Sequence, residues 1–359
     1  MAFPIIPYRW RIVALLFFLS VLNYLDRQAL SVLAPTLRAT FGFSTVEYSY
    51  IVATFLVAYT IGYVFCGAVI DRIGVRMAVV AALAMWSVAG MLHALATGWI
   101  TLALCRFLLG LGESFNAPSG MKAIAEWIPK RERGLCTAIF SNGNIVGAII
   151  APPFVAFVAL RYGWQWGFLA TGLLGFFYLI FWLKYYSSPD VQPRLSAAER
   201  DYLAADVGGP GGGALSDWLV RRGWTPVKAR RRMLLVAACI MPLAVVAVHA
   251  TSAAVALGLI AVLLAAQSCW NTNLLTMMSE TFPREQVATF VALSGIGGSI
   301  GGILSTLLAG TVIHRVGYVP VFTCLGFLHL TAYFVITLRA LPRTPSRPEI
   351  GPAGGQLVS

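Results

Sequence analysis

Four ionisable residues lie inside long apolar runs of the chain: Asp26 and Arg27 in the stretch LNYLDRQALS, and Arg106 and Glu113 in the stretch RFLLGLGESF. A charge near the middle of a bilayer costs at least about 2.5 kcal/mol, so such residues are rare and by default mark ligand or proton pathways. Arginine binds carboxylates through two parallel hydrogen bonds and stays charged. A buried carboxyl group can gain or lose a proton. The four residues therefore indicate an anion site that is coupled to protons.

The spacing of these residues along a helix decides which of them can act together. Asp26 and Arg27 are neighbours, and neighbouring helical side chains point about 100° apart, so we expect them to face different partners. Arg106 and Glu113 share one helix face, roughly 10 Å apart along the axis. We assign the arginines to a carboxylate and the acids to protons, whose binding then depends on whether an anion occupies the arginines. The alternative is that the charges are ion pairs that only hold helices together.

The composition identifies the elements that position these charges. Of the 359 residues, 58% are hydrophobic and 11% are charged, and the mean hydropathy is +0.78, which is typical of a polytopic membrane protein. A helix needs roughly 20 apolar residues to cross the hydrocarbon core. We expect an all-α protein with about ten transmembrane helices, at residues 12–36, 47–69, 77–96, 99–121, 135–160, 163–183, 233–250, 253–275, 287–313 and 317–338.

The formal net charge of +12 could suggest a nucleic-acid partner, but its distribution gives another explanation. With a cytoplasmic N-terminus, twenty of the 26 Lys and Arg residues fall in cytoplasmic segments, and three, Arg38, Arg161 and Arg315, fall in outer connections. This asymmetry follows the positive-inside rule. It predicts a multi-pass membrane protein with both termini in the cytoplasm and no nucleic-acid partner.

Two sequence repeats divide the chain into related halves. The stretch GAVIDRIGVR, which starts at Gly67, recurs loosely as GALSDWLVRRG at Gly213, an offset of 146 residues. The stretch EWIPKRERGLCTAIFSNGNIVGAI, which starts at Glu126, matches ETFPREQVATFVALSGIGGSIGGI at Glu280, an offset of 154 residues. Internal repeats of this kind are common in transporters. The sequence therefore predicts two pseudo-symmetric helical halves.

The second half lacks counterparts of the first two helices. An offset of 146 residues places the counterpart of the first run near residue 158, inside the fifth run, and the segment after the sixth run is polar and then glycine-rich from Gly208 to Gly213. Such a segment cannot span a bilayer. We expect an N-terminal six-helix half at 1–183, a cytoplasmic inter-half loop with a glycine-rich joint and a basic segment at 184–232, a four-helix remnant half at 233–338, and a disordered cytoplasmic tail at 339–359.

Four stretches resemble the major facilitator superfamily and, within it, the anion:cation symporter family that includes hexuronate and galactonate transporters. They are LNYLDRQALSVLAP, GAVIDRIGVR, RFLLGLGESFNAPSGMKAIAEWIPKRER and the APP of the fifth run. The resemblance covers nearly the whole chain apart from the absent helix pair and the C-terminal tail. It implies a major facilitator fold in a bacterial-type inner membrane and proton-driven symport of small organic anions by alternating access. Hexuronates or related sugar acids are the expected substrates.

The resemblance also bears on particular residues. It agrees with proton coupling at Asp26 and Glu113 and with substrate binding at Arg27, Arg106, Tyr24 and Tyr59, although a single membrane tyrosine packs as often as it binds. It identifies GAVIDRIGVR as a gating motif, in which a glycine lets helices approach and charged residues bridge helix ends. The motif residues are Gly67, Asp71, Arg72, Gly74 and Arg76.

The second half offers further candidates. Gln267 stands at the repeat position of Glu113, and with Trp270 it could contact a sugar hydroxyl, or both could serve only in contacts between helices. A row of glycines in the ninth run predicts a close-packing face that mirrors the fifth run. These are Gly297, Gly298, Gly301 and Gly302, against Gly143 and Gly147.

Other functional classes have no residues to support them. No nucleophile elbow, phosphate loop or zinc spacing occurs, and the six cysteines contain no CxxC pair. We therefore expect no enzyme activity, metal or cofactor, and the expected partners are a small organic anion, a proton or sodium ion, and the lipid bilayer. The competing hypothesis is a transport-inactive membrane protein that at most binds an organic anion, because a six-plus-four bundle leaves one wall of the family's cavity open.

Overall fold

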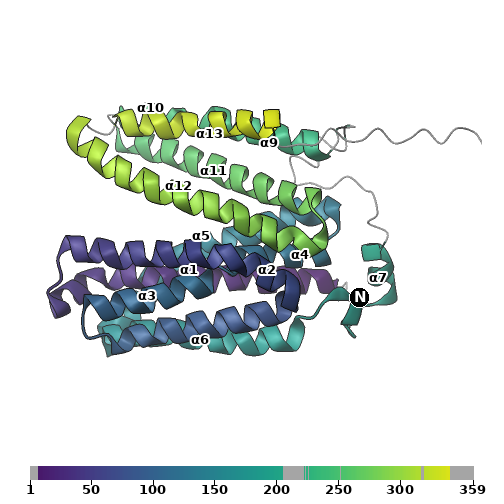
Figure 1. Ribbon diagram of the computed structural model, residues 1–359, viewed down its shortest axis with the longest axis horizontal. Helices are drawn as coiled ribbons and strands as arrows, with labels where there is room; N and C mark the ends of the chain where they lie inside the picture. Colours follow the sequence, from purple (N-terminus) through teal and green to yellow (C-terminus); the bar gives the residue numbers. More distant parts are fainter. Residues whose placement is uncertain are drawn as a thin grey trace, which may run out of the picture.

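The computed structural model describes residues 7–204, 222, 224, 226–250, 252–316 and 319–339, and every regular element in these ranges is a helix (Figure 1). Eight of the described helices are long and apolar enough to cross a membrane. The helices of the N-terminal half lie together as one bundle, and those of the C-terminal half lie against it as a second bundle (Figure 1). The predicted all-α membrane fold is confirmed.

The first bundle consists of α1 (Tyr8–Phe41), α2 (Thr45–Leu92), α3 (Trp99–Glu113), α4 (Asn116–Trp127), α5 (Lys130–Tyr162) and α6 (Trp164–Tyr185). The local sequence explains the turn between the first two. α1 ends at Gly42, whose φ of 68° suits glycine. At the start of α2, the Ser44 hydroxyl accepts the Glu47 amide at 3.2 Å and the Glu47 carboxylate accepts the Ser44 amide at 2.6 Å.

α2 contains the predicted pair of helices, which meet at a kink without a longer loop between them. It runs through 48 residues and covers the predicted runs 47–69 and 77–96. Its backbone leaves the helical region at Gly74, where φ is 79° and ψ is 157°. A straight helix of this length would measure about 72 Å, more than twice the thickness of the hydrocarbon core. Gly74 therefore joins two membrane segments without a separate loop.

The predicted run 99–121 is divided as well. α3 ends at Glu113 and α4 begins at Asn116. Eight membrane-length segments are described, and one of them, α2, holds two of the predicted runs. α3 and α4 together make up one more run. The total agrees with the ten predicted segments. The backbone at this boundary keeps helical angles, and the amides of Ser114 and Phe115 donate to the carbonyl oxygens of Gly110 and Gly112 at 3.2 and 3.3 Å.

The second bundle consists of α9 (Pro226–Ile240), α10 (Leu243–Val248), α11 (Ala253–Thr281), η3 (Arg284–Gln286), α12 (Val287–Val316) and α13 (Val319–Arg339). The predicted run 233–250 is split between α9 and α10 beside Pro242, which lacks the amide hydrogen that a continuous helix needs. Between the bundles lie η2 (Pro189–Val191) and α7 (Ala197–Ala204), whereas the predicted glycine-rich joint at 208–213 and tail residues 340–359 lie outside the described residues.

Glycines let α5 pack closely on α1, but the matching glycines of α12 have no such neighbour. A Cβ added at Gly143 would lie 2.5 Å from the Phe17 carbonyl oxygen of α1. A Cβ added at Gly297, Gly298 or Gly301 would have none of the described atoms within 4 Å. At these three positions, the described residues therefore supply no packing partner for the predicted close-packing face on α12.

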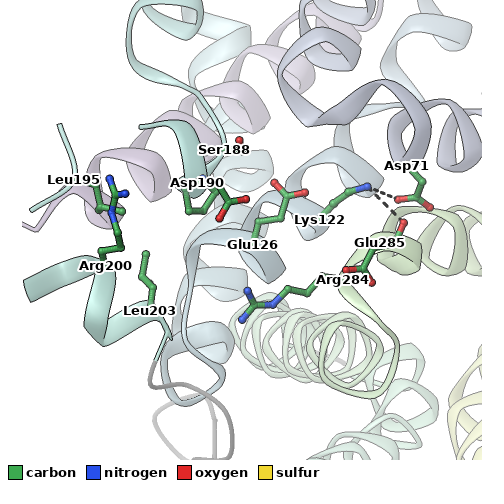
Figure 2. A pocket seen from close by; sticks show the side chains of 11 residues that line it. Asp71, Lys122, Glu126, Ser188, Asp190, Leu195, Arg200, Leu203, Arg284 and Glu285 are labelled. Atoms are coloured by element: carbon green, nitrogen blue, oxygen red, sulfur yellow. Dashed lines mark hydrogen bonds and ion pairs between the residues drawn. The ribbon is translucent and has the colours of Figure 1, made fainter. Parts of the chain in front are cut away.

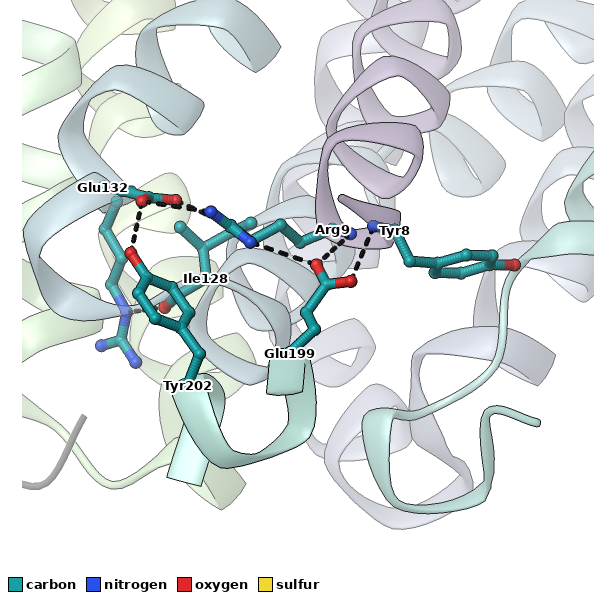
Figure 3. Close-up of polar contacts among 7 residues, drawn as sticks. Tyr8, Arg9, Ile128, Glu132, Glu199 and Tyr202 are labelled. Carbon is teal, nitrogen blue, oxygen red and sulfur yellow. Dashed lines mark hydrogen bonds and ion pairs between the residues drawn. The ribbon is translucent and has the colours of Figure 1, made fainter. Parts of the chain in front are cut away.

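The inter-half segment is fastened to the first bundle through α7 (Figure 3). The Glu199 carboxylate accepts the backbone amides of Tyr8 at 2.8 Å and Arg9 at 3.0 Å, the first amides of α1. Arg9 Nε donates to Glu132 at 2.9 Å, and the Tyr202 hydroxyl donates to the same carboxylate at 2.6 Å. An acid at a helix N-terminus satisfies free amides and the helix dipole. α7 therefore ties the starts of α1 and α5 together.

Candidate functional site

Arg27 of α1 and Glu113 at the end of α3 form a buried ion pair. Arg27 Nε and Nη2 donate to Glu113 Oε2 at 2.9 and 2.7 Å. The Glu113 side chain is 0% exposed and the Arg27 side chain is 26% exposed, so the arginine can be reached and the acid cannot. Glu113 Oε1 has no hydrogen-bond partner among the described residues. The pair holds one carboxylate on a guanidinium, as a bound substrate carboxylate would be held.

Aromatic rings enclose the Arg27 guanidinium. Its central carbon lies 4.8 Å from the centre of the Tyr24 ring, 4.9 Å from that of Phe55 and 5.0 Å from that of Tyr59. The Tyr63 hydroxyl donates to the Tyr59 hydroxyl at 3.3 Å. Such contacts hold a cation without neutralising it. Sequence reasoning missed Phe55, although its position one helical turn before Tyr59 places both rings on one face of α2 and could have identified it.

Arg106 of α3 lies beside this pair. Its side chain is buried, and its Nη2 donates to the Arg27 carbonyl oxygen at 3.1 Å. Its central carbon lies 5.8 Å from the centre of the Phe55 ring, and its Nε has no hydrogen-bond partner among the described residues. A buried guanidinium with an unused donor is costly without an anion. The structure thus brings both predicted arginines and both predicted tyrosines to one place.

Asp26 faces away from this cluster, as its position next to Arg27 on the helix predicts. It is buried, and neither carboxylate oxygen has a hydrogen-bond partner in the described part of the chain. A Cβ added at Gly90 of α2 would lie 3.7 Å from Asp26 Oδ1 and 4.0 Å from the Gly172 Cα of α6. Asp26 therefore lies where α1, α2 and α6 meet, without an ion pair to either arginine among the described residues but close enough to interact with the charges of Arg106 and Glu113.

The candidates of the second half lie elsewhere. Trp270 of α11 packs in the core of the second bundle, with its ring 5.0 Å from that of His329 on α13 at an angle of 83°. Gln267, one turn earlier on α11, is half-buried. The contacts described for these two residues do not join them to Arg27, and their role in substrate binding stays a prediction.

The gating motif joins the two bundles at the end of the molecule that carries the N-terminus. The Asp71 carboxylate accepts from Lys122 Nζ at 2.8 Å and from the backbone amide and hydroxyl of Thr289 at 3.1 and 2.6 Å. Gly67 permits this approach, because a Cβ there would lie 2.5 Å from the Thr289 Cα. Neither Lys122 nor Thr289 was predicted. The only signal in the sequence was Asp71 itself, a charged residue that was expected to bridge helix ends.

The other motif residues act within the first bundle. Arg76 Nη2 donates to the Leu183 carbonyl oxygen of α6 at 2.8 Å, and Trp182 Nε1 donates to the Arg76 carbonyl oxygen at 3.2 Å. Arg72 is exposed, and Gly74 forms the kink of α2. The predicted motif therefore contains one residue that bridges the bundles through its side chain, Asp71.

Arg133 of α5 is a second bridge, which sequence reasoning missed. Its buried guanidinium donates to three backbone carbonyl oxygens, those of Ala125 at 2.8 Å, Ile128 at 2.9 Å and Ser279 at 2.7 Å. Ser279 belongs to α11, so this side chain connects the bundles at the same end as Asp71.

A cavity of 520 Å³ lies beside these bridges (Figure 2). Its lining includes Asp71, Lys122, Glu126, Asp190 and Arg284. Burial raises the pKa of Glu126 to about 7, with Lys122 opposing the shift and Asp190 adding to it. Glu126 lies beyond the predicted membrane run 99–121, at the entrance between the bundles.

The chain is similar in sequence to one protein family and to several proteins named as transporters. A family model described as Major Facilitator Superfamily matches residues 16–248. The chain is 37% identical over 195 residues to a hexuronate transporter of Escherichia coli K12, covering 54% of this chain and 45% of that protein. It is 36% identical over 201 residues to a galacturonate transporter of Dickeya chrysanthemi, covering 56% and 58%. The chain thus spans about half the length of the curated relatives it matches.

Solved structures share the fold. A double-tryptophan mutant of XylE superposes with a TM-score of 0.75 at 15% identity, covering 92% of this chain and 95% of the other. The human organic anion transporter MFSD10 superposes with a TM-score of 0.70 at 14% identity, covering 92% and 100%. At these identities the likeness concerns the fold alone.

Proposed function

This chain belongs to the Major Facilitator Superfamily, and on that premise we propose that it carries small organic anions across an inner membrane by proton-coupled symport, with both termini in the cytoplasm. Hexuronates or related sugar acids are the proposed substrates, because the relatives at 36–37% identity are named transporters of hexuronate and galacturonate. The single observation that carries the proposal is the buried, aromatic-enclosed pair of Arg27 and Glu113 with Arg106 beside it.

Substrate capture is an exchange of carboxylates on Arg27. The guanidinium is partly exposed and already binds a carboxylate through two donors. A substrate carboxylate replaces Glu113 there and takes further donors from Arg106. The rings of Tyr24 and Tyr59 border the same space, and their hydroxyls are available to a sugar acid.

The same exchange couples the anion to a proton. Once displaced from Arg27, Glu113 has no cation at hydrogen-bonding distance, and a lone buried carboxylate is costly, so Glu113 takes up a proton. Asp26 provides a second proton site on a different face of α1, where it makes no ion pair with the arginines among the described residues. The contacts of Asp71 and Arg133 hold one end of the path closed and break when the bundles rock.

The test is uptake of labelled glucuronate or galacturonate into proteoliposomes that contain the full chain. We expect uptake to follow an imposed proton gradient in the wild type and to vanish in Arg27→Ala. In Asp26→Asn we expect binding to persist while gradient-driven accumulation is lost. Uptake that is unchanged in Arg27→Ala would contradict the proposed site.

A second candidate function is favoured by one observation: a Cβ added at Gly297, Gly298 or Gly301 of α12 would meet none of the described atoms within 4 Å. No described helix packs at these positions, and a chain whose second bundle is open there could bind an anion without alternating. Binding that depends on Arg27, in liposomes that show neither uptake nor counterflow, would support this function and exclude symport.

A further inference from the structure

Three segments meet at a fixed platform beside the start of α1. The Tyr8 hydroxyl donates to the Tyr185 carbonyl oxygen at the end of α6 at 2.6 Å. Gln192 of the inter-half segment is buried, and its Nε2 donates to the Tyr8 hydroxyl at 3.0 Å and to the same carbonyl at 3.2 Å. The Tyr8 ring and the backbone of Tyr185 are therefore held together by contacts among three separate parts of the chain.

Three exposed cations gather around these rings. Arg11 lies with its central carbon 5.5 Å from the centre of the Tyr8 ring, and Lys184 Nζ and the Arg194 central carbon lie 5.5 and 5.3 Å from that of Tyr185. Among the described residues, no carboxylate forms an ion pair with any of the three. Arg11 and Arg194 also line a cavity of 450 Å³.

The acid nearest this cavity is already occupied (Figure 3). Glu199 accepts from two backbone amides of α1 and from Arg9 Nη1 at 3.2 Å. It is therefore not free to neutralise Arg11 or Arg194, and the surface keeps a local excess of positive charge.

An apolar track on α6 leads from the membrane to these cations. The Phe177 and Phe181 rings lie 5.1 Å apart, and the Phe181 and Tyr185 rings lie 6.5 Å apart and are stacked. Phe177 is 60% exposed and Phe181 is 41% exposed. α6 is long and apolar enough to span the bilayer, so these rings face lipid chains and the tyrosine stands at the interface.

We propose that this surface binds one anionic phospholipid. The cations Arg11, Lys184 and Arg194 surround the phosphodiester, and an acyl chain lies along Phe177 and Phe181. Guanidinium and ammonium groups bind phosphate oxygens, and basic clusters at the ends of membrane helices bind anionic headgroups. The adjoining apolar track favours a lipid over a free phosphate, because an acyl chain can contact the exposed phenylalanines and a phosphate ion cannot.

The experiment is native mass spectrometry of the delipidated full chain, titrated with phosphatidylglycerol or with phosphatidylcholine of the same acyl chains. We expect one tightly bound phosphatidylglycerol and no comparable phosphatidylcholine. In Lys184→Gln/Arg194→Gln we expect affinity for phosphatidylglycerol to fall about 30-fold, because each basic residue at an anionic surface contributes about 1 kcal/mol. The charge-preserving variant Lys184→Arg/Arg194→Lys should retain most of the affinity for phosphatidylglycerol. This control tests whether substitution at these positions by itself disturbs binding.

A matched control removes the same charge at the other end of the bundle. Arg38 and Arg161 are exposed, and Arg38 also lies over a tyrosine ring, that of Tyr48 at 6.0 Å. Arg38→Gln/Arg161→Gln should bind phosphatidylglycerol as the wild type does. The proposal is overturned if both double variants lose affinity equally, if neither does, or if millimolar inorganic phosphate displaces the lipid.

Discussion

At the scale of single side chains, the two acids of the candidate site have different surroundings. Glu113 is seated on Arg27, whereas Asp26 has no hydrogen-bond partner among the described residues. Glu113 therefore competes with a bound anion, and Asp26 does not. Changes at the two positions should separate binding from coupling.

In Glu113→Gln, we expect sugar-acid affinity to rise about tenfold, because the charged competitor for Arg27 is gone and charged hydrogen bonds contribute about 1.5–3 kcal/mol. Gradient-driven accumulation should be lost, since the amide cannot carry a proton. Isothermal titration calorimetry measures the first effect and proteoliposome uptake measures the second. Weaker binding in this variant would show that Glu113 supports the anion site instead of competing with it.

Glu126 should make closure at the N-terminal end of the molecule depend on pH. Burial raises the pKa of Glu126 above its ordinary value, to about 7, so the closed arrangement favours the protonated acid. Closure is therefore most stable at low pH and weakens as the pH rises through 7, where the acid becomes charged beside Asp190. Double electron–electron resonance between labels at the exposed positions Ile73 and Gln286 should show longer distances at pH 8 than at pH 5.

In Glu126→Gln, these distances should stay short at both pH values, because the amide does not titrate. Asp201→Asn on the surface of α7 is the matched control and should keep the pH response. Persistence of the response in Glu126→Gln would assign it to another group.

At the scale of helices, Gly143 and Gly297 stand at matching positions of the two halves but differ in their surroundings. Gly143→Ala should destabilise the protein by about 1–3 kcal/mol, because the added Cβ meets the Phe17 carbonyl oxygen at 2.5 Å. Gly297→Ala should be neutral or stabilising by about 0.5–1 kcal/mol, because it meets none of the described atoms and alanine favours a helix. Thermal unfolding of the detergent-solubilised variants measures both, and equal losses would mean that α12 has a partner in solution.

The helices were predictable where one local signal determined them. Hydropathy located the segments, and the spacing of Asp26 and Arg27 placed them on different faces. The abrupt junction at Gly74 was not predictable, because the hydropathy runs end at 69 and begin again at 77, whereas the two helices reach Gly74 from both sides. Contacts between distant segments were equally hidden, since nothing local to Asp71 specifies Thr289 as its partner.

At the scale of the whole molecule, a few polar contacts hold the bundles together at one end. Asp71→Asn removes the ion pair to Lys122 and weakens acceptance from Thr289, so that end should open more often. Ser279→Cys, at a buried position, reports the change on a background without native cysteines. We expect maleimide to label this cysteine about tenfold faster with Asp71→Asn, which corresponds to about 1.4 kcal/mol. An unchanged rate would place the closing contacts elsewhere.

The contacts of Arg133 have a consequence for how this chain can accumulate mutations. All three acceptors are backbone carbonyl oxygens, which every amino acid supplies in the same place as long as the helices keep their course. Substitutions at Ser279 that fit the available space therefore leave the bridge intact, whereas the arginine itself has no substitute with the same fork of donors. For this contact between the bundles, the risk of mutation therefore lies at Arg133 and not in the side chain of Ser279.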